Sequence, residues 1–214
     1  MELVLKRATL AVAVLGVLLL LASGPGVRLG LWPWQTGFLL MRIAVYVGAA
    51  AALLALIGML VPRTRGMALA GALALGVATA AVPLEFQRRA RAVPPINDIS
   101  TAGDTAPAMA EQQRRAYPEV RPLVLDMGSE EAFAKALRAA REMGWEIVSA
   151  DPAAGRIEAV ATTPWFGFED DVTVGISGQN GASRIDVRSR SRVGRGDAGA
   201  NARRILRYLQ MLRV

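Results

Sequence analysis

The sequence contains no cysteine and no histidine. Without cysteine there are no disulfides, no zinc–thiolate sites and no thiol catalysis. Without histidine there is no Ser-His-Asp triad, no histidine–metal site and no imidazole acid or base. A glycine-rich phosphate loop is missing too. We therefore expect no bound metal, haem or nucleotide, and only carboxylates, arginines, two lysines, tyrosines and hydroxyl groups remain for chemistry.

Charge is scarce in the first part of the chain. Between Ala8 and Leu84 the only charged residues are Arg28, Arg42, Arg63 and Arg65. The formal charge of +7 is basic, yet residues 92–214 carry 16 Lys/Arg and 16 Asp/Glu. The excess positive charge lies at the ends of the apolar segments, where membrane proteins anchor their helices. This distribution argues for a lipid bilayer as partner and against nucleic acid.

Three apolar runs predict a membrane region over residues 1–87, with transmembrane helices at about 8–22, 43–61 and 67–84. Trp32 and Trp34 precede the second run, as in an interfacial aromatic belt. The basic start of the first run also fits a signal peptide, but Leu20 and Ala22 make a poor cleavage site. An uncleaved anchor is favoured.

Small residues recur at helical spacing in the last two runs. Ala72, Gly76 and Ala80 form one stripe, and Gly48 and Ala52 form a similar patch. Such stripes allow close helix contact in membranes. General enrichment in alanine explains them equally well, so both interpretations stay open.

The rest of the chain is predicted to be an extended, proline-containing linker (88–116) and a soluble α+β domain (117–214). Alternating and helical patterns give the order β-α-β-β-β-β-α, and an antiparallel sheet with both helices on one face is the simplest assembly. The expected strands are 122–126, 145–149, 156–163, 171–177 and 183–193.

Two amphipathic helices are expected in this domain. Ser129 is the predicted N-cap of the first, which stops at Gly144. Asp197 is predicted to cap the second. In that helix the expected inward residues are Ala202, Ile205, Leu206, Leu209 and Leu212, and the expected outward residues are Arg203, Arg204, Arg207 and Arg213.

The last two strands can be placed in register. Asn180-Gly181 is a strong signal for a two-residue hairpin turn and pairs residues whose numbers sum to 361. Val172, Val174 and Ile176 then share one face with Ile185, Val187 and Ser189, while Arg184, Asp186, Arg188, Arg190 and Arg192 share the other.

Three segments carry a family resemblance: residues 94–101 (PPINDIST), 165–171 (WFGFEDD), and 183–201 with its SRIDVRS start, Asp197 and Asn201. The chain resembles the bacterial family known as domain of unknown function 1499, in its form with an N-terminal membrane region. Ala102 and Arg190 depart from the acidic and uncharged residues expected there. The resemblance implies no reaction, cofactor or catalytic residue.

One functional hypothesis is a membrane-anchored accessory or binding module that contacts a protein, a lipid or a small anionic ligand. Aromatic side chains beside charge suggest such a surface, and the alternative is that the rings close the core beside a solvated charged face. Arg188 or Arg192 would be free to bind an anion, and replacing both by glutamine would shift the melting temperature by only a few degrees. The candidate binding residues are Trp165, Phe166, Phe168, Glu169, Asp171, Arg188, Arg190 and Arg192.

The alternative hypothesis is a carboxylate-based enzyme of the cell envelope that uses Glu169, Asp170 and Asp171. Asp170 and Asp171 point to opposite faces of a strand, and arginines are expected opposite Glu169 and Asp171, so this hypothesis is the weaker one. Transport by three helices without a central ionisable residue is weaker still.

The expected location is the bacterial inner membrane, multi-pass, with the N-terminus inside and the soluble domain in the periplasm. Basic Lys6 and Arg7 before the first span favour this orientation. A membrane-protein partner or a homo-oligomer is compatible with the small-residue stripes.

Overall fold

The computed structural model describes residues 2–213, without the side chain of Gln179, and divides into two compact units. The first comprises the chain up to Arg89 together with the loop Pro164–Gly167. The second comprises Ala90–Thr163 and the chain from Phe168 onward. Each unit is described by itself.

The first unit is built from three apolar helices, each long and apolar enough to span a membrane. They are α1 (Glu2–Arg28), α2 (Trp34–Leu60) and α3 (Met67–Arg91), with the short 3-10 turn η1 (Pro62–Thr64) between the last two. The three predicted helices are confirmed. Helix α1 extends beyond both expected ends, α2 begins earlier than expected, at Trp34, and α3 ends later, at Arg91. Hydropathy marks only the apolar centre of a span, whereas helical hydrogen bonding continues through the polar ends.

Small residues bring α2 and α3 into backbone contact. A Cβ atom added at Gly76 would lie 2.5 Å from the carbonyl oxygen of Gly48 and 2.8 Å from the amide nitrogen of Ala52. Ala72 is fully buried on the same stripe. Of the two interpretations of these small residues, close helix contact is therefore the one that the structure supports at Gly48 and Gly76.

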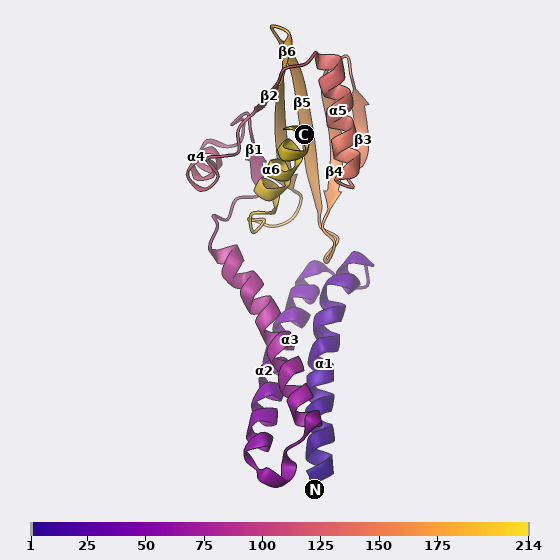
Figure 1. Cartoon of the computed structure of the whole chain (residues 1–214), viewed down its shortest axis with the longest axis vertical. Coiled ribbons are helices and arrows are strands. Elements are labelled where there is room, and N and C mark those ends of the chain that lie inside the picture. Colours follow the sequence, from indigo (N-terminus) through magenta and orange to yellow (C-terminus); the bar gives the residue numbers. More distant parts are fainter. Residues whose placement is uncertain (1, 214) are drawn as a thin grey trace. The chain divides into compact units, whose positions relative to one another are not determined.

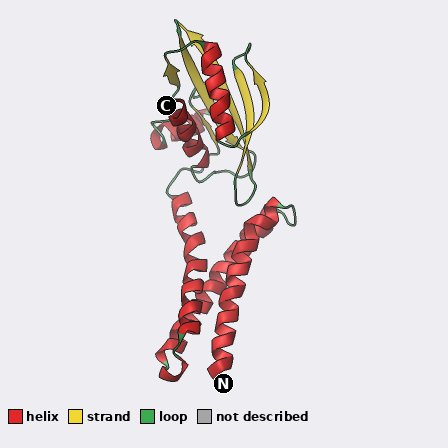
Figure 2. Cartoon of the chain, turned by 45° about the vertical axis from the view of Figure 1, so that its right-hand side comes forward, coloured by secondary structure: helices red, strands yellow, loops and turns green. Residues whose placement is uncertain are grey.

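The second unit contains one antiparallel sheet. Its strand order is β1-β6-β5-β4-β3, and β2 pairs with another part of β6. Figure 1 labels the strands of this sheet, and Figure 2 shows them in yellow. The strands are β1 (Asp98–Ser100), β2 (Leu123–Leu125), β3 (Glu146–Asp151), β4 (Arg156–Thr162), β5 (Glu169–Gln179) and β6 (Ala182–Ser191).

Helices α5 (Ser129–Glu142) and α6 (Ala200–Arg213) cover one face of the sheet, as predicted (Figure 1). Their apolar stripes meet the buried residues of β4, β5 and β6 in a single core. Tyr208 is fully buried in it, stacks on Trp145 at a centroid distance of 4.8 Å, and donates a hydrogen bond to the carbonyl of Ala136. The predicted α+β fold is confirmed.

The hairpin register is confirmed in full. Val174 pairs with Val187 and Ile176 with Ile185, so every pair sums to 361. Asn180 and Gly181 both adopt positive φ angles, 49° and 84°. Two positive φ angles at the turn are the hairpin geometry that an Asn-Gly sequence favours.

Two regular elements lie within residues 88–116, where the sequence suggested an extended linker. Strand β1 pairs with β6, and helix α4 (Pro107–Ala116) follows it. The side-chain amide of Gln113 accepts a hydrogen bond from the backbone N–H of Ser100 and donates one to its carbonyl. These bonds are tertiary, so local composition does not reveal them.

Of the two N-caps predicted from the sequence, Ser129 and Asp197, only Asp197 forms capping hydrogen bonds. Ser129 is the first residue of α5 rather than its cap, which is Gly128 and forms no side-chain hydrogen bond. Asp197 behaves as predicted, because its carboxylate accepts hydrogen bonds from the N–H groups of Gly199 and Asn201. Burial raises the pKa of Asp197 above its usual value, and the two backbone donors partly oppose that shift.

Candidate functional site

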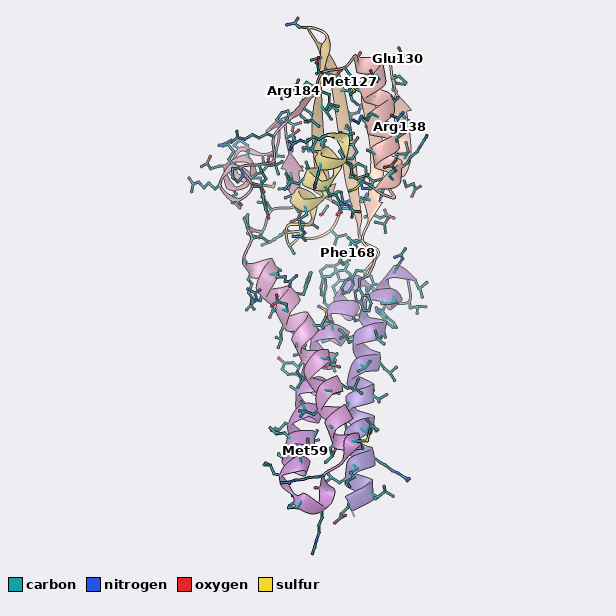
Figure 3. The ribbon with its side chains drawn as sticks, in the orientation of Figure 1. Met59, Met127, Glu130, Arg138, Phe168 and Arg184 are labelled. Carbon is teal, nitrogen blue, oxygen red and sulfur yellow. The ribbon has the colours of Figure 1, made fainter. Side chains whose placement is uncertain are left out.

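A row of charged side chains lies along β6, on the face of the sheet away from α5 and α6. Burial alternates strictly along the strand up to Val187 and beyond, as the sequence predicted. Arg184 lies towards the hairpin end of this row, and Phe168, before β5, lies at the opposite end (Figure 3). We call this the β6 surface; its members are Arg184, Asp186, Arg188, Arg190 and Arg192.

Arg188 is paired with the carboxylate of Asp98, which lies 90 residues earlier in the sequence. Its Nε and Nη2 donate to the two oxygens of Asp98, at 2.9 and 2.7 Å, and Asp104 lies 3.6 Å from its Nη1. Asp98 is only 5% exposed. The hydrogen bond to Asp98 raises the pKa of Arg188, so the guanidinium stays charged.

The expectation that Arg188 is free is therefore wrong. Removing its guanidinium would leave a buried carboxylate unpaired, and such a change destabilises a fold more than the loss of an exposed pair does. The expected melting-temperature shift of only a few degrees does not apply to Arg188.

Arg192 is also paired, in the way that the register predicted. Its guanidinium bonds Asp171, at 2.9 Å from Nε, and also Glu169. The bond to Asp171 raises the pKa of Arg192. All three side chains are about half exposed, so solvent screens the pairing and the pairs contribute little to stability.

Arg190 is the member of the row without an ion pair inside residues 2–213. It lies between two carboxylates, because its register partners are Asp98 on β1 and Asp171 on β5. Asp98 is bonded to Arg188 and Asp171 to Arg192. The exposed guanidinium of Arg190 thus keeps its donors available to a ligand.

A shallow depression adjoins this row. It has a volume of about 220 Å³ and is lined by residues of β4, β5 and β6, including Arg156, Thr173, Asp186 and Arg188, together with Ser100, Ala102 and Asp104. Its charges are balanced, since Arg156 pairs with Glu158 and Asp186 with Arg184.

The candidate aromatic residues are divided between the two units. Trp165 and Phe166 belong to the first unit, whereas Phe168 belongs to the second. Within the first unit the ring of Phe166 stacks on Phe38 at a centroid distance of 4.9 Å, and Trp165 fills the space where Gly24 lacks a side chain. Among residues 2–213, the core of the α+β domain does not include Trp165, Phe166 or Phe168.

Residues 98–212, more than half of the chain, match the family model described as "Protein of unknown function (DUF1499)". The chain belongs to the DUF1499 family. The match begins at Asp98, the residue that holds Arg188, and runs through nearly all of α6. Among curated proteins none matches the chain.

The three consecutive carboxylates of this DUF1499 domain all have arginine partners. Glu169 and Asp171 bond Arg192, while Asp170 points into the domain, 3% exposed, and bonds Arg204 at 2.5 Å. Alternation along β5 separates Asp170 from its neighbours, as predicted. A carboxylate fixed by a guanidinium is a poor base and a poor cation ligand, so this arrangement disfavours the enzyme hypothesis.

Arg204 was predicted to face outward, and the structure corrects this. Its Nη1 donates to Ser189 at 2.8 Å and also to Asn201, whose side chain in turn bonds Ser191 and the carbonyl of Asn97. Helical spacing carries the missed signal, because Arg204 stands three residues after the buried Asn201 and four before the buried Tyr208.

No group of three or more Asp or Glu side chains that could hold a metal ion occurs within residues 2–213 of this DUF1499 chain. The carboxylates of Asp98 and Asp171, which border the β6 surface, are bonded to Arg188 and Arg192.

Proposed function

We propose that this protein is a membrane-anchored binding module of the bacterial inner membrane. Its α+β domain presents the β6 surface, in the periplasm, to an anionic group on a protein, a lipid or a small ligand. Arg188, Arg190 and Arg192 supply the positive charge, Glu169 and Asp171 border it, and Phe168 lies at the end of the row. Three apolar helices long enough to span a membrane support the anchor.

The observation that carries this proposal is that Arg190 has no ion pair with the described residues 2–213, whereas the other arginines of the row are paired. A guanidinium presents donors in a planar fork that matches a carboxylate or a phosphate. Neighbouring Arg188 is fixed by the buried carboxylate of Asp98, which orders the surface beside Arg190. An anion that reaches Arg190 therefore meets a preorganised surface and costs little side-chain ordering.

We expect Arg190→Gln to lose function without losing stability. Complementation of a deletion strain and cross-linking of the full-length chain to its neighbours in native membranes should both fall, while the melting temperature stays within a few degrees because Arg190 is exposed. Arg138→Gln on α5 is the matched control, since Arg138 is exposed on the other side of the sheet (Figure 3). Full complementation by Arg190→Gln, equal to that of the control, would move the functional surface elsewhere.

We expect a C-terminal alkaline phosphatase fusion to be active and a C-terminal green fluorescent protein fusion to be dark in a bacterial host. Three spans place the two ends of the chain on opposite sides of the membrane, and Lys6 and Arg7 favour an inside N-terminus. The reverse pattern, a fluorescent fusion with an inactive phosphatase, would place the domain in the cytoplasm.

A further inference from the structure

A larger pocket lies next to the depression beside Arg188 in the second unit, and the two linings share Ser100 and Ala102. It has a volume of about 470 Å³ and is lined by the end of β1 and the chain after it, by α4 and by residues 117–121. Small-molecule sites range from roughly 300 to 1,000 Å³. The depression beside Arg188, at about 220 Å³, falls below that range, so this pocket is the better place for a small ligand.

Its lining combines an apolar wall with two cations. Tyr117, Pro118 and the buried Ala110 and Val120 contribute to the wall. The charged residues that line the pocket are both arginines, Arg114 and Arg121. The lining set contains no carboxylate, and Glu111, which pairs with Arg114, lies outside it, so the lining itself attracts an anion.

Two of the uncharged polar side chains of the lining already form hydrogen bonds within the protein. Gln113 uses its amide oxygen and nitrogen on the backbone of Ser100, and Thr101 donates to Asp186 and accepts from the N–H of Val187. Each of the two arginines has further N–H donors besides the one that it already uses within the protein. Arg121 uses Nε on the carbonyl of Pro118, and Arg114 uses Nη2 on Glu111.

We propose that this pocket binds a small amphipathic anion. Arg114 and Arg121 hold its carboxylate or phosphate group through their remaining N–H donors, and a short apolar body packs against Ala110 and Val120. The ligand can be a free molecule from the aqueous phase or the charged end of a lipid, since both present the same chemistry. The site is separate from Arg190 and does not depend on the proposed role of the β6 surface.

The test uses the full-length chain in phosphatidylcholine nanodiscs and a hexanoate that carries an alkyl diazirine. After illumination and proteolysis, mass spectrometry should locate the label within residues 100–121. Unlabelled hexanoate should compete best, phosphate less well because it lacks the apolar body, and hexanol least because it lacks the charge. Repeating the labelling in nanodiscs that contain phosphatidylglycerol separates the two sources: reduced labelling identifies a lipid anion, and unchanged labelling identifies a free one.

Arg114→Gln combined with Arg121→Gln should reduce labelling about tenfold or more, the change expected when a charge-assisted hydrogen bond is lost. Arg115→Gln is the matched control, because Arg115 pairs with the same Glu111 and does not line the pocket. All three arginines are exposed, so the variants should fold. Equal labelling of the double variant and the control, equal competition by hexanol, or label found only outside residues 100–121 would overturn the proposal.

Discussion

Replacing Arg204 by methionine should lower the free energy of unfolding of the second unit by about 3–5 kcal/mol, the usual cost of leaving one partner of a buried ion pair alone. The side chains of Arg204 and Asp170 are 11% and 4% exposed. Water cannot readily solvate Asp170 once its partner is gone, and Ser189 loses a donor as well. The change is therefore far larger than for an arginine on the domain surface.

The measurement is urea unfolding of the full-length chain in a mild detergent, followed by the fluorescence of Trp145. The other tryptophans, Trp32, Trp34 and Trp165, all belong to the first unit and can be replaced by phenylalanine. Trp145 is buried against Tyr208, so its emission reports on the core of the second unit.

Arg207→Met is the matched control, because Arg207 is one turn further along α6 and exposed. It should change stability by less than about 0.5 kcal/mol. The double variant Asp170→Leu with Arg204→Met should be more stable than the sum of the two single changes allows, since no charge is left unpaired. An Arg204→Met variant as stable as Arg207→Met would show that the pair contributes nothing to the fold.

Replacing Gly76 by alanine should destabilise the helical unit, although alanine is the better helix former. The new Cβ would lie 2.5 Å from the carbonyl oxygen of Gly48 and 2.8 Å from the amide nitrogen of Ala52. Both are backbone atoms, so no side chain can rotate away and α2 and α3 must separate. Overpacking of this kind costs about 1–3 kcal/mol.

Gly71→Ala on the same helix is the control, and for it we expect a change in stability of the opposite sign. An added Cβ at Gly71 meets no other atom within 4 Å, so only the helix propensity changes, in favour of alanine by up to about 1 kcal/mol. The measurement is the fraction of sodium dodecyl sulfate at which the full-length chain loses helicity by circular dichroism. Gly76→Ala should unfold at a lower fraction than the parent chain and Gly71→Ala at an equal or higher one. The same shift in both variants would mean that α2 and α3 do not touch at Gly76.

The sequence alone determined those features of the protein that depend on neighbours along the chain. Hydropathy located α1, α2 and α3, because a membrane span needs a continuous apolar segment. Asn180-Gly181 and the alternation around it set the register of β5 and β6, since turn geometry and a two-residue period leave one solution. The arginine row on one side of β6 follows from that same period.

Only the tertiary structure decided which charged groups of the second unit find partners. Arg188 and Asp98 are 90 residues apart and Arg204 and Asp170 are 34 apart, and no local pattern pairs side chains across such separations. Strand β1 and helix α4 depend likewise on β6 and on Gln113. Arg204 is largely buried although arginine side chains usually lie on the surface, because a buried carboxylate offsets the cost of removing its guanidinium from water. The same pairings left Arg190 as the member of the β6 surface without a carboxylate partner in residues 2–213, a property that depends on where Asp98 and Asp171 bond in the folded domain.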